Sequence, residues 1–270
     1  MTATNGIPRV ITIANQKGGV GKTTTAINLG TALAAIGERV LIVDLDPQGN
    51  ASTGVGIDQE RRKVSTYSVL VGESGLTETV VATDVPRLSV SPSTLDLLGV
   101  ELEIADEADR VYRLRDAIRA GVVDGEGVPF DYILVDCPPS LNLLTVNAMA
   151  ASHSVLVPLQ CEFFALEGLS QLLKTVEQVK RSVNPGLSIH GIVLTMFDSR
   201  NNLSGQVVAD VREYMGEKVY DTVIPRNVRI SEAPSYGKPA LLYDFKCSGS
   251  QAYLKLASEI IQRERALRAA

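Results

Sequence analysis

The sequence has little cysteine, no tryptophan and no long apolar run. Its three cysteines, Cys137, Cys161 and Cys247, show neither C-x-x-C nor metal-binding spacing, which predicts reduced structural thiols in a cytosolic protein. No apolar stretch approaches the roughly 18 to 20 residues that a membrane span needs. The first ten residues also lack the basic start and apolar core of an export signal. We therefore expect a cytoplasmic protein that does not enter a membrane.

An excess of basic charge is also missing. Lysine and arginine number 26 against 31 aspartates and glutamates, so the formal net charge is −5. Any binding to nucleic acid would therefore need a local basic patch, or two copies that pool their charge. With 45% hydrophobic and 21% charged residues, the chain has the composition of a globular protein with a large core. A length of 270 residues predicts one domain, covering residues 1–270.

Short continuous apolar runs alternate with stretches of helical periodicity. Such runs are typical of interior strands of a parallel sheet, and we predict strands at 10–14, 40–44, 132–136, 154–159 and 189–196. Apolar residues at three- and four-residue spacing predict helices at 23–35, 165–179 and 204–215. This alternation predicts an α/β fold: a doubly wound, mostly parallel sheet flanked by helices.

Two segments fit the alternation less well. Residues 56–128 contain one predicted strand at 88–90 and one helix at 109–120, and we interpret them as a partly helical insertion. Residues 250–267 place apolar side chains on one helical face and then become rich in arginine and glutamate. This pattern predicts a docking helix with a solvated end and argues against a membrane anchor.

A glycine-rich loop carries the strongest chemical signal. It directly follows the first predicted strand and opens the first helix, and it consists of Lys17, Gly18, Gly19, Val20, Gly21, Lys22, Thr23 and Thr24. In this context, backbone N–H groups and the positive end of the helix bind phosphates. We expect Lys22 to face the β- and γ-phosphates of a nucleotide and the Thr23 hydroxyl to ligate Mg²⁺. The loop predicts a P-loop NTPase.

The same loop departs from the general P-loop form. Gln16 stands where the first glycine is expected, and a second lysine, Lys17, follows it. Lys17 cannot easily fold back onto the phosphates of its own loop, but it could reach phosphates that a second copy binds.

Acidic residues end two of the predicted strands. Asp136 follows an apolar run, so its carboxylate should emerge at the phosphate-binding edge of the sheet and hold Mg²⁺, usually through water. Asp44 and Asp46 follow another strand, where a carboxylate could orient or deprotonate the attacking water. We expect Asp46 to brace the turn that follows it.

These motifs together resemble the ParA-type partitioning ATPases of the deviant Walker A group, over nearly the whole chain. The resemblance rests on the loop and on further blocks at 44–50, 136–140, 157–162, 194–200 and 224–229. It implies that Lys17 contacts nucleotide in the opposite subunit of an ATP-sandwiched dimer, and it favours Asp44 as the catalytic carboxylate. The expected catalytic residues are thus Asp44, Lys17 and Lys22.

The resemblance also assigns residues near the end of the chain. It places the adenine near Met196, Pro225 and Asn227, and it points to Arg200 and Arg229 for DNA binding without sequence preference. Composition does not show this by itself, because residues 200–246 hold seven lysines and arginines against six acids. A dimer would double any local excess of positive charge on one face.

The expected function is therefore an ATP-dependent partitioning ATPase at the bacterial nucleoid. Mg-ATP would drive formation of a homodimer that binds DNA, and hydrolysis would release it. The sequence offers no obvious arginine finger, so hydrolysis should be slow, and the resemblance implies acceleration by a ParB-type centromere-binding partner.

The sequence leaves three alternative functions to compare. A MinD-like division-site ATPase would need an apolar face near residues 259–270, which are rich in Arg, Glu and Ala instead. An enzyme such as a nitrogenase iron protein would need cluster-binding cysteines in glycine-rich loops, which Cys137 and Cys161 lack. A nucleotide switch without turnover is separated only by measurement. His153 and His190 form no recognisable constellation, and we assign them no role.

Overall fold

The computed structural model describes residues 7–123 and 130–269. Residues 124–128 of the predicted insertion, and six of the ten residues considered as an export signal, lie outside these ranges. Eight strands form one sheet in the order β3-β4-β2-β5-β1-β6-β7-β8. All strand pairs are parallel except β3 with β4. The strands are β1 Arg9–Ile13, β2 Val40–Asp44, β3 Val81–Ala82, β4 Leu88–Ser91, β5 Tyr132–Asp136, β6 Ser154–Gln160, β7 Ser188–Phe197 and β8 Val219–Pro225.

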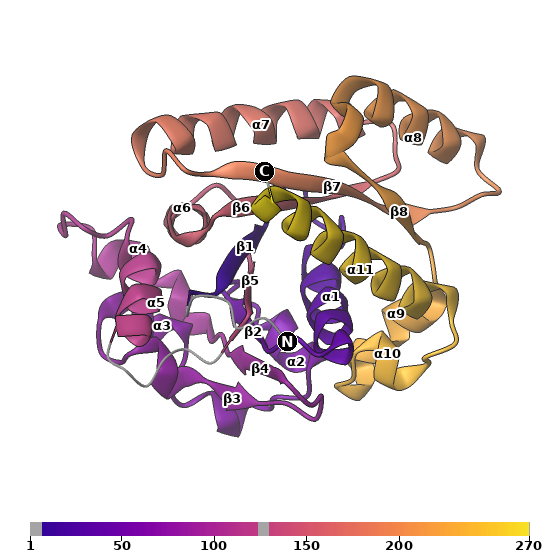
Figure 1. Cartoon of the computed structure of the whole chain (residues 1–270). Coiled ribbons are helices and arrows are strands. Elements are labelled where there is room, and N and C mark those ends of the chain that lie inside the picture. The colour runs from indigo at the N-terminus through magenta and orange to yellow at the C-terminus, as the bar shows by residue number, and fades with distance from the viewer. Residues whose placement is uncertain (1–6, 124–129, 270) are drawn as a thin grey trace.

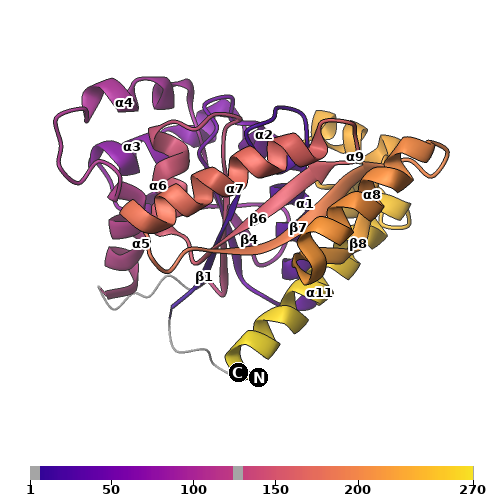
Figure 2. The same cartoon turned by 90° about the horizontal axis from the view of Figure 1, so that it is seen from above.

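Helices cover both faces of this sheet (Figure 1). The α-helices are α1 Lys22–Ile36, α2 Asn50–Gly54, α3 Thr66–Val71, α4 Val100–Glu103, α5 Arg113–Val123, α6 Leu143–Ala151, α7 Ala165–Ser182, α8 Asn202–Met215, α9 Val228–Glu232, α10 Ala240–Tyr243 and α11 Ser248–Ala269. Five 3₁₀ segments are η1 Gln59–Arg62, η2 Leu76–Thr79, η3 Leu95–Leu98, η4 Gly216–Lys218 and η5 Ala233–Tyr236. Helices α7 and α8 lie along β6, β7 and β8 on one face, whereas α1 and α11 pack together on the other (Figures 1 and 2).

Strand residues alternate between two apolar cores. In β2, Leu41 and Val43 belong to the core under α5 to α8, whereas Val40 and Ile42 belong to the core under α1 and α11. All four side chains are fully buried. Because successive strand residues point to opposite faces, burial on both faces requires an unbroken apolar run. The predicted doubly wound α/β fold is confirmed.

The sequence missed several elements. Helix α6 is buried around most of its circumference, so it lacks a clear amphipathic period. Strand β8 lies at the sheet edge and mixes buried with exposed residues. Helix α5 begins four residues later than predicted, after a turn at Tyr112. The segment interpreted as an insertion also contributes β4 to the main sheet, where it pairs with β2. The described part of that segment is therefore continuous with the principal fold.

A buried polar network ties the last helix to the amino ends of the strands. The carboxylate of Glu264 in α11 accepts hydrogen bonds from Arg9 Nε at 2.9 Å, and it lies 2.8 Å from His190 Nε2. The other ring nitrogen of His190 contacts the Tyr220 hydroxyl. Three strands, β1, β7 and β8, are thereby joined to one helix. His190 has a structural role here, which its isolated position in the sequence did not reveal.

Candidate active site

The glycine-rich loop connects the carboxyl end of β1 to the amino end of α1. Gly19 and Gly21 have φ angles of 76° and 91°, in the left-handed region that favours glycine. Gly21 caps α1, and its carbonyl accepts the Thr25 N–H at 2.8 Å. This conformation leaves the first N–H groups of a 15-residue helix directed at the loop, which is the arrangement that binds phosphate.

A cavity of about 560 Å³ opens above this loop. Gly18, Gly19, Gly21, Lys22, Thr23 and Thr24 line it from the loop side. The opposite walls come from Asp46, Pro47, Gln48, Asn50, Leu98, Pro138, Pro139, Ser140, Asn142 and Met196. The Lys22 ammonium donates to the Lys17 carbonyl at 3.1 Å, and burial lowers the pKa of Lys22 while Asp136 acts to raise it. The structure thus brings the predicted phosphate-binding residues together, Lys17 and Val20 excepted.

Asp136 lies at the end of β5 with a buried carboxylate. Neither of its oxygens has a hydrogen-bond partner among the described residues, although the side chain is fully buried. Burial raises the pKa of Asp136 well above its usual range, and the neighbouring Asp44 raises it further. A buried carboxylate without a donor is costly unless a cation neutralises it. Asp136 and the Thr23 hydroxyl therefore form an oxygen-rich site that fits Mg²⁺.

Asp44 and Asp46 occupy different environments, and Asp46 braces the following turn as predicted, because its side chain accepts the Gln48 N–H at 3.0 Å. Asp44 is fully buried and does not line the cavity, whereas Asp46 does. One Asp44 oxygen accepts the backbone N–H and the hydroxyl of Ser52 at 2.8 and 2.7 Å, and the other accepts the Asp46 N–H at 3.2 Å. Burial raises the pKa of Asp44 to about 6, although the Ser52 hydrogen bonds act to lower it. Asp46 therefore lines the cavity, and the role of Asp44 as the catalytic carboxylate stays a prediction.

A buried arginine, which no local sequence pattern indicates, braces the loop that carries Asp46. Arg62 is 4% exposed. Its guanidinium donates to the carbonyls of Gly49, Ile57 and Ser93 and to the Thr53 hydroxyl, at distances from 2.6 to 3.4 Å. A planar group with five donors can join several chain segments at once. Arg62 thereby links both ends of α2 to the segment that follows β4.

A second, smaller cavity of about 270 Å³ adjoins the first. Gly21, Thr24 and Met196 line both cavities, so the two are continuous. All three residues predicted to lie near the adenine, Met196, Pro225 and Asn227, line this smaller cavity. Residues that the sequence did not point to complete its walls, namely Thr195, Ile224, Arg226, Ile230, Ser231, Pro234 and Tyr253. Its size, and walls that combine apolar side chains with polar groups, suit a planar base.

Six of the predicted site residues line neither cavity: the buried Val20, Asp44 and Asp136, and three surface residues, Lys17, Arg200 and Arg229. Lys17 forms an ion pair with Glu162 and so extends away from its own loop. Arg200 contacts Asp198 at 2.7 Å, and its side chain is 85% exposed. Arg229 contacts Glu232 at 3.0 Å and is 53% exposed. None of the three can act on nucleotide within the same chain in this conformation.

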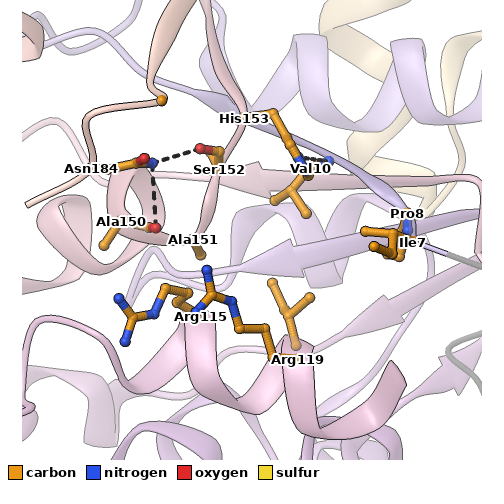
Figure 3. Close-up of a pocket in the computed structure, with 12 residues that line it drawn as sticks. Ile7, Pro8, Val10, Arg115, Arg119, Ala150, Ala151, Ser152, His153 and Asn184 are labelled. Carbon is orange, nitrogen blue, oxygen red and sulfur yellow. Dashed lines mark hydrogen bonds between the residues drawn. The ribbon is translucent and has the colours of Figure 1, made fainter. Parts of the chain in front are cut away.

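Another cavity, of about 450 Å³, lies at the amino ends of the strands (Figure 3). Arg115 and Arg119 rise from α5 toward its opposite wall at Ala151 and Ser152 (Figure 3). Several of its polar groups already have partners: Asn184 donates to the carbonyls of Met149 and Ser152, and Arg115 contacts Asp116. This cavity has no glycine-rich loop and is not a rival nucleotide site.

The loop at a helix amino end, its lysine, the threonine and the unpartnered aspartate define a P-loop ATPase. Residues 8–189 match the protein family described as an AAA domain. The chain is 64% identical to the chromosome partitioning protein ParA of Caulobacter vibrioides over 257 residues, which are 95% of each chain. It is 52% identical over 252 residues to the sporulation initiation inhibitor protein Soj of Bacillus subtilis, covering 93% of this chain and 98% of Soj. The chain therefore belongs to the ParA-type family of partitioning ATPases.

Solved structures agree with this assignment. A Mycobacterium smegmatis protein named cobyrinic acid a,c-diamide synthase, with bound ADP and magnesium, is 37% identical with a TM-score of 0.82, covering 96% of both chains. The cell division ATPase MinD of Pyrococcus furiosus is 32% identical with a TM-score of 0.76, covering 95% of this chain and 99% of MinD. This chain is an ATPase that uses ATP and Mg²⁺. Across residues 7–123 and 130–269, every helix is too short or too polar to cross a membrane.

Proposed function

We propose that this protein partitions DNA through a cycle in which ATP assembles a dimer, the dimer binds DNA and hydrolysis releases it. ParA and Soj, the relatives at 64% and 52% identity, are the first support, since the name of the former refers to chromosome partitioning. The cycle requires that ATP bind at a surface where a second copy can complete the site.

The orientation of Lys17 is the observation that carries this proposal. Its side chain is 43% exposed and extends from the loop toward Glu162, away from the cavity beside it. Phe163 and Phe164 follow Glu162 directly, and they are 74% and 59% exposed with their rings in edge-to-face contact. Exposed apolar side chains beside a charged group that faces outward are typical of an interface. A second copy would cover the phenylalanines and receive the Lys17 ammonium next to its own phosphates.

The chemistry within each site follows from three groups of this chain. Lys22 and the loop N–H groups would hold the phosphates, and Thr23 and Asp136 would hold Mg²⁺, which neutralises phosphate charge. Asp46 lines the phosphate cavity and is the better placed carboxylate to orient the attacking water. The resemblance gave this role to Asp44, whose two oxygens are engaged by Ser52 and the Asp46 N–H. Among the described residues, one Asp46 oxygen is engaged, by the Gln48 N–H.

DNA binding depends more strongly on dimerisation than the other steps of the cycle do. Arg200 and Arg229 are exposed, but each contacts an acidic neighbour, Asp198 or Glu232. A phosphate must therefore compete with a carboxylate for each guanidinium, which weakens binding by one copy. Two copies would present four such arginines, so DNA affinity should rise steeply on dimerisation. A ParB-type partner would then stimulate hydrolysis, and the dimer at the nucleoid would dissociate.

Co-sedimentation with DNA tests the cycle directly. The protein should sediment with unrelated DNA fragments in the presence of Mg-ATP, and remain in solution with ADP or without nucleotide. Retention that is the same under all three conditions would contradict the proposal. The MinD-like alternative predicts ATP-dependent binding to anionic lipid vesicles in place of DNA, so vesicle flotation under the same conditions separates the two functions.

A further inference from the structure

The cavity at the amino ends of the strands combines apolar walls with cationic ones (Figure 3). Its volume of about 450 Å³ lies in the range of small-molecule sites in proteins. Val10, Ile118 and Ala150 are at most 6% exposed, so this part of the lining belongs to the packed interior. The apolar residues of the lining are Ile7, Pro8, Val10, Ile118, Ala150 and Ala151. Such walls suit the apolar part of a ligand.

Two arginines supply the charge of this cavity, and none of the described residues that line it is acidic. Arg115 and Arg119 lie one helical turn apart on α5, and both extend toward the opposite wall (Figure 3). Arg115 contacts Asp116 at 2.8 Å and stacks on the Tyr112 ring. Arg119 forms no ion pair or hydrogen bond with any residue that the structure describes. Its guanidinium therefore brings an unpaired positive charge to the cavity.

His153 adds a neutral hydrogen-bond donor to the lining. Its Nδ1 accepts the Val10 N–H at 3.0 Å, so the proton of the neutral ring lies on Nε2. Burial lowers the pKa of His153, and the positive charge of Arg9 lowers it further, so the ring is neutral near pH 7. Within the described part of the chain, Nε2 has no acceptor. The Nε2–H group can therefore donate to a ligand.

The backbone acceptors on the wall opposite α5 already have a donor, Asn184. Its side-chain amide donates to the carbonyls of Met149 and Ser152 at 2.9 and 2.8 Å, and it lies 3.4 Å from that of Ala150. These carbonyls come from the carboxyl end of α6, where helix carbonyls lack partners within the helix. Because Asn184 supplies those partners, the acceptor for Arg119 must come from a ligand or from solvent.

We infer that this cavity binds a small organic carboxylate with a compact apolar body. Arg119 would pair with the carboxylate, His153 would donate to a polar group of the ligand, and the apolar body would cover Val10 and Ile118. A nucleotide does not fit, because one unpaired cation cannot neutralise a triphosphate. A neutral apolar ligand would leave the Arg119 charge without a partner. The site is separate from the phosphate cavity, with which it shares no lining residue.

Probes of one shape and different charge test this site. They are naphthalene-2-carboxylate, the neutral naphthalene-2-carboxamide and the cation naphthalen-2-ylmethylammonium. Each is titrated into the isotope-labelled full chain with saturating Mg-ADP, which occupies the phosphate cavity, and amide chemical shifts are followed by NMR. The carboxylate should bind with a dissociation constant on the order of 1 mM or lower, at least about tenfold more tightly than the other probes. The largest shifts should fall on the amides of residues 150–153, which line the cavity.

Variants locate the binding on the molecule. Arg119→Gln, at an exposed position, should keep the fold but lose the preference for the carboxylate over the carboxamide. Ala151→Leu places a larger side chain in the cavity and should weaken binding of the carboxylate at least about tenfold. The matched control is Arg181→Gln on α7, which makes the same change of charge at a side chain that is 78% exposed, and it should bind as wild type does.

Several outcomes would overturn the inference. These are failure of the carboxylate to bind, equal affinity for all the probes, and shifts concentrated away from residues 150–153. A preference for the carboxylate that persists in Arg119→Gln, or that is lost equally in Arg181→Gln, would be as damaging. Thermal unfolding identifies variants that have lost the fold. A folded Ala151→Leu protein that binds the carboxylate as wild type does would place the ligand elsewhere and so contradict the assignment.

Discussion

Asp44 and Asp136 are register partners at the carboxyl ends of the adjacent parallel strands β2 and β5. Both carboxylates are fully buried, yet they differ completely in their bonding. Asp44 accepts three hydrogen bonds from its own loop, whereas neither oxygen of Asp136 has a donor among residues 7–123 and 130–269. The first carboxylate organises the chain that follows β2, and the second has oxygens that a cation would neutralise.

Asp44, the last residue of β2, and Asp46, two residues later, should respond differently to substitution. Asp46→Ala should lower single-turnover hydrolysis by roughly 10² to 10⁴ with little change in ATP affinity, because a group that orients water acts in the transition state. The ATP dimer should then accumulate on DNA. Rapid-quench hydrolysis together with ATP titration checks this. Hydrolysis at the wild-type rate would return the role to Asp44 or to another residue.

Asp44→Ala should chiefly affect stability. It leaves the buried Ser52 hydroxyl and N–H without their acceptor, which costs about 1 to 3 kcal/mol of the free energy of unfolding for each such group. Chemical denaturation measures the loss; Asp46→Ala, which removes one hydrogen bond from the Gln48 N–H, is the comparison and should lose less. A fully stable Asp44→Ala protein that binds ATP but does not hydrolyse it would show that Asp44 is catalytic, as the sequence led us to expect.

Removal of the Lys22 ammonium should weaken ATP binding. Lys22 lies in the phosphate cavity beside Asp136, so Lys22→Ala removes a positive charge from the β- and γ-phosphates. Isothermal titration calorimetry should show affinity for Mg-ATP lower by at least about tenfold. Binding within a few-fold of wild type would be inconsistent with the loop as the nucleotide site.

Lys17 should separate dimerisation from binding. Because its side chain extends to Glu162 and not into its own cavity, Lys17→Ala should bind ATP almost as wild type does but remain monomeric. Light scattering with Mg-ATP measures the dimer, and Lys174→Ala, on α7, provides a control with the same change of charge. A normal dimer of the Lys17 variant would remove this lysine from the interface.

The exposed arginines should contribute to DNA binding without regard to sequence. Arg200→Glu and Arg229→Glu should weaken binding to unrelated DNA fragments by similar factors, and each should lower the salt dependence, by about 0.9 in the logarithmic slope per lost phosphate contact. ATP-driven dimerisation should be unaffected. Wild-type retention on DNA at moderate salt, or loss confined to some sequences, would exclude these residues from a phosphate-binding surface.

Acid should weaken the network at the amino ends of the strands. Burial alone would raise the pKa of Glu264, but His190 and Arg9 hold it below its ordinary value of 4.5. A depressed carboxyl pKa stabilises the fold above pH 4.5, and this stabilisation is lost as the pH falls through the lower, folded-state value. Thermal unfolding of Glu264→Gln should therefore differ most from wild type at neutral pH, and the two should converge in acid. A difference that stays constant with pH would exclude ionisation of Glu264 as the cause.

The fold could be predicted because burial on both faces leaves a direct trace in the sequence. The strands β1, β2, β5, β6 and β7 are mainly apolar, so each was located within one or two residues. Strand β8 lies at the sheet edge, where only one neighbour sets the pattern, and it was missed. The segment after residue 56 was misjudged because its short elements are held by tertiary contacts such as those of Arg62, which no local pattern encodes.

The phosphate-binding loop could be predicted from local sequence, but the roles of the acidic residues could not. A loop of consecutive residues, such as 17–24, has a conformation that its own glycines determine, so sequence spacing is sufficient. The roles of Asp44 and Asp46 depend on which side chain Ser52 reaches from the next helix, and two aspartates two residues apart look alike in the sequence.

The strand order places the first part of the chain on one side of the molecule and the rest on the other. Strands β1 to β5 lie together, and β6 to β8 continue the sheet beyond β1. The carboxylates and the phosphate loop belong to the first group, whereas most of the smaller cavity belongs to the second. A nucleotide bound across both cavities would contact both groups of strands and resist a twist of one group against the other. Loss of the γ-phosphate would remove contacts only on the side of the carboxylates.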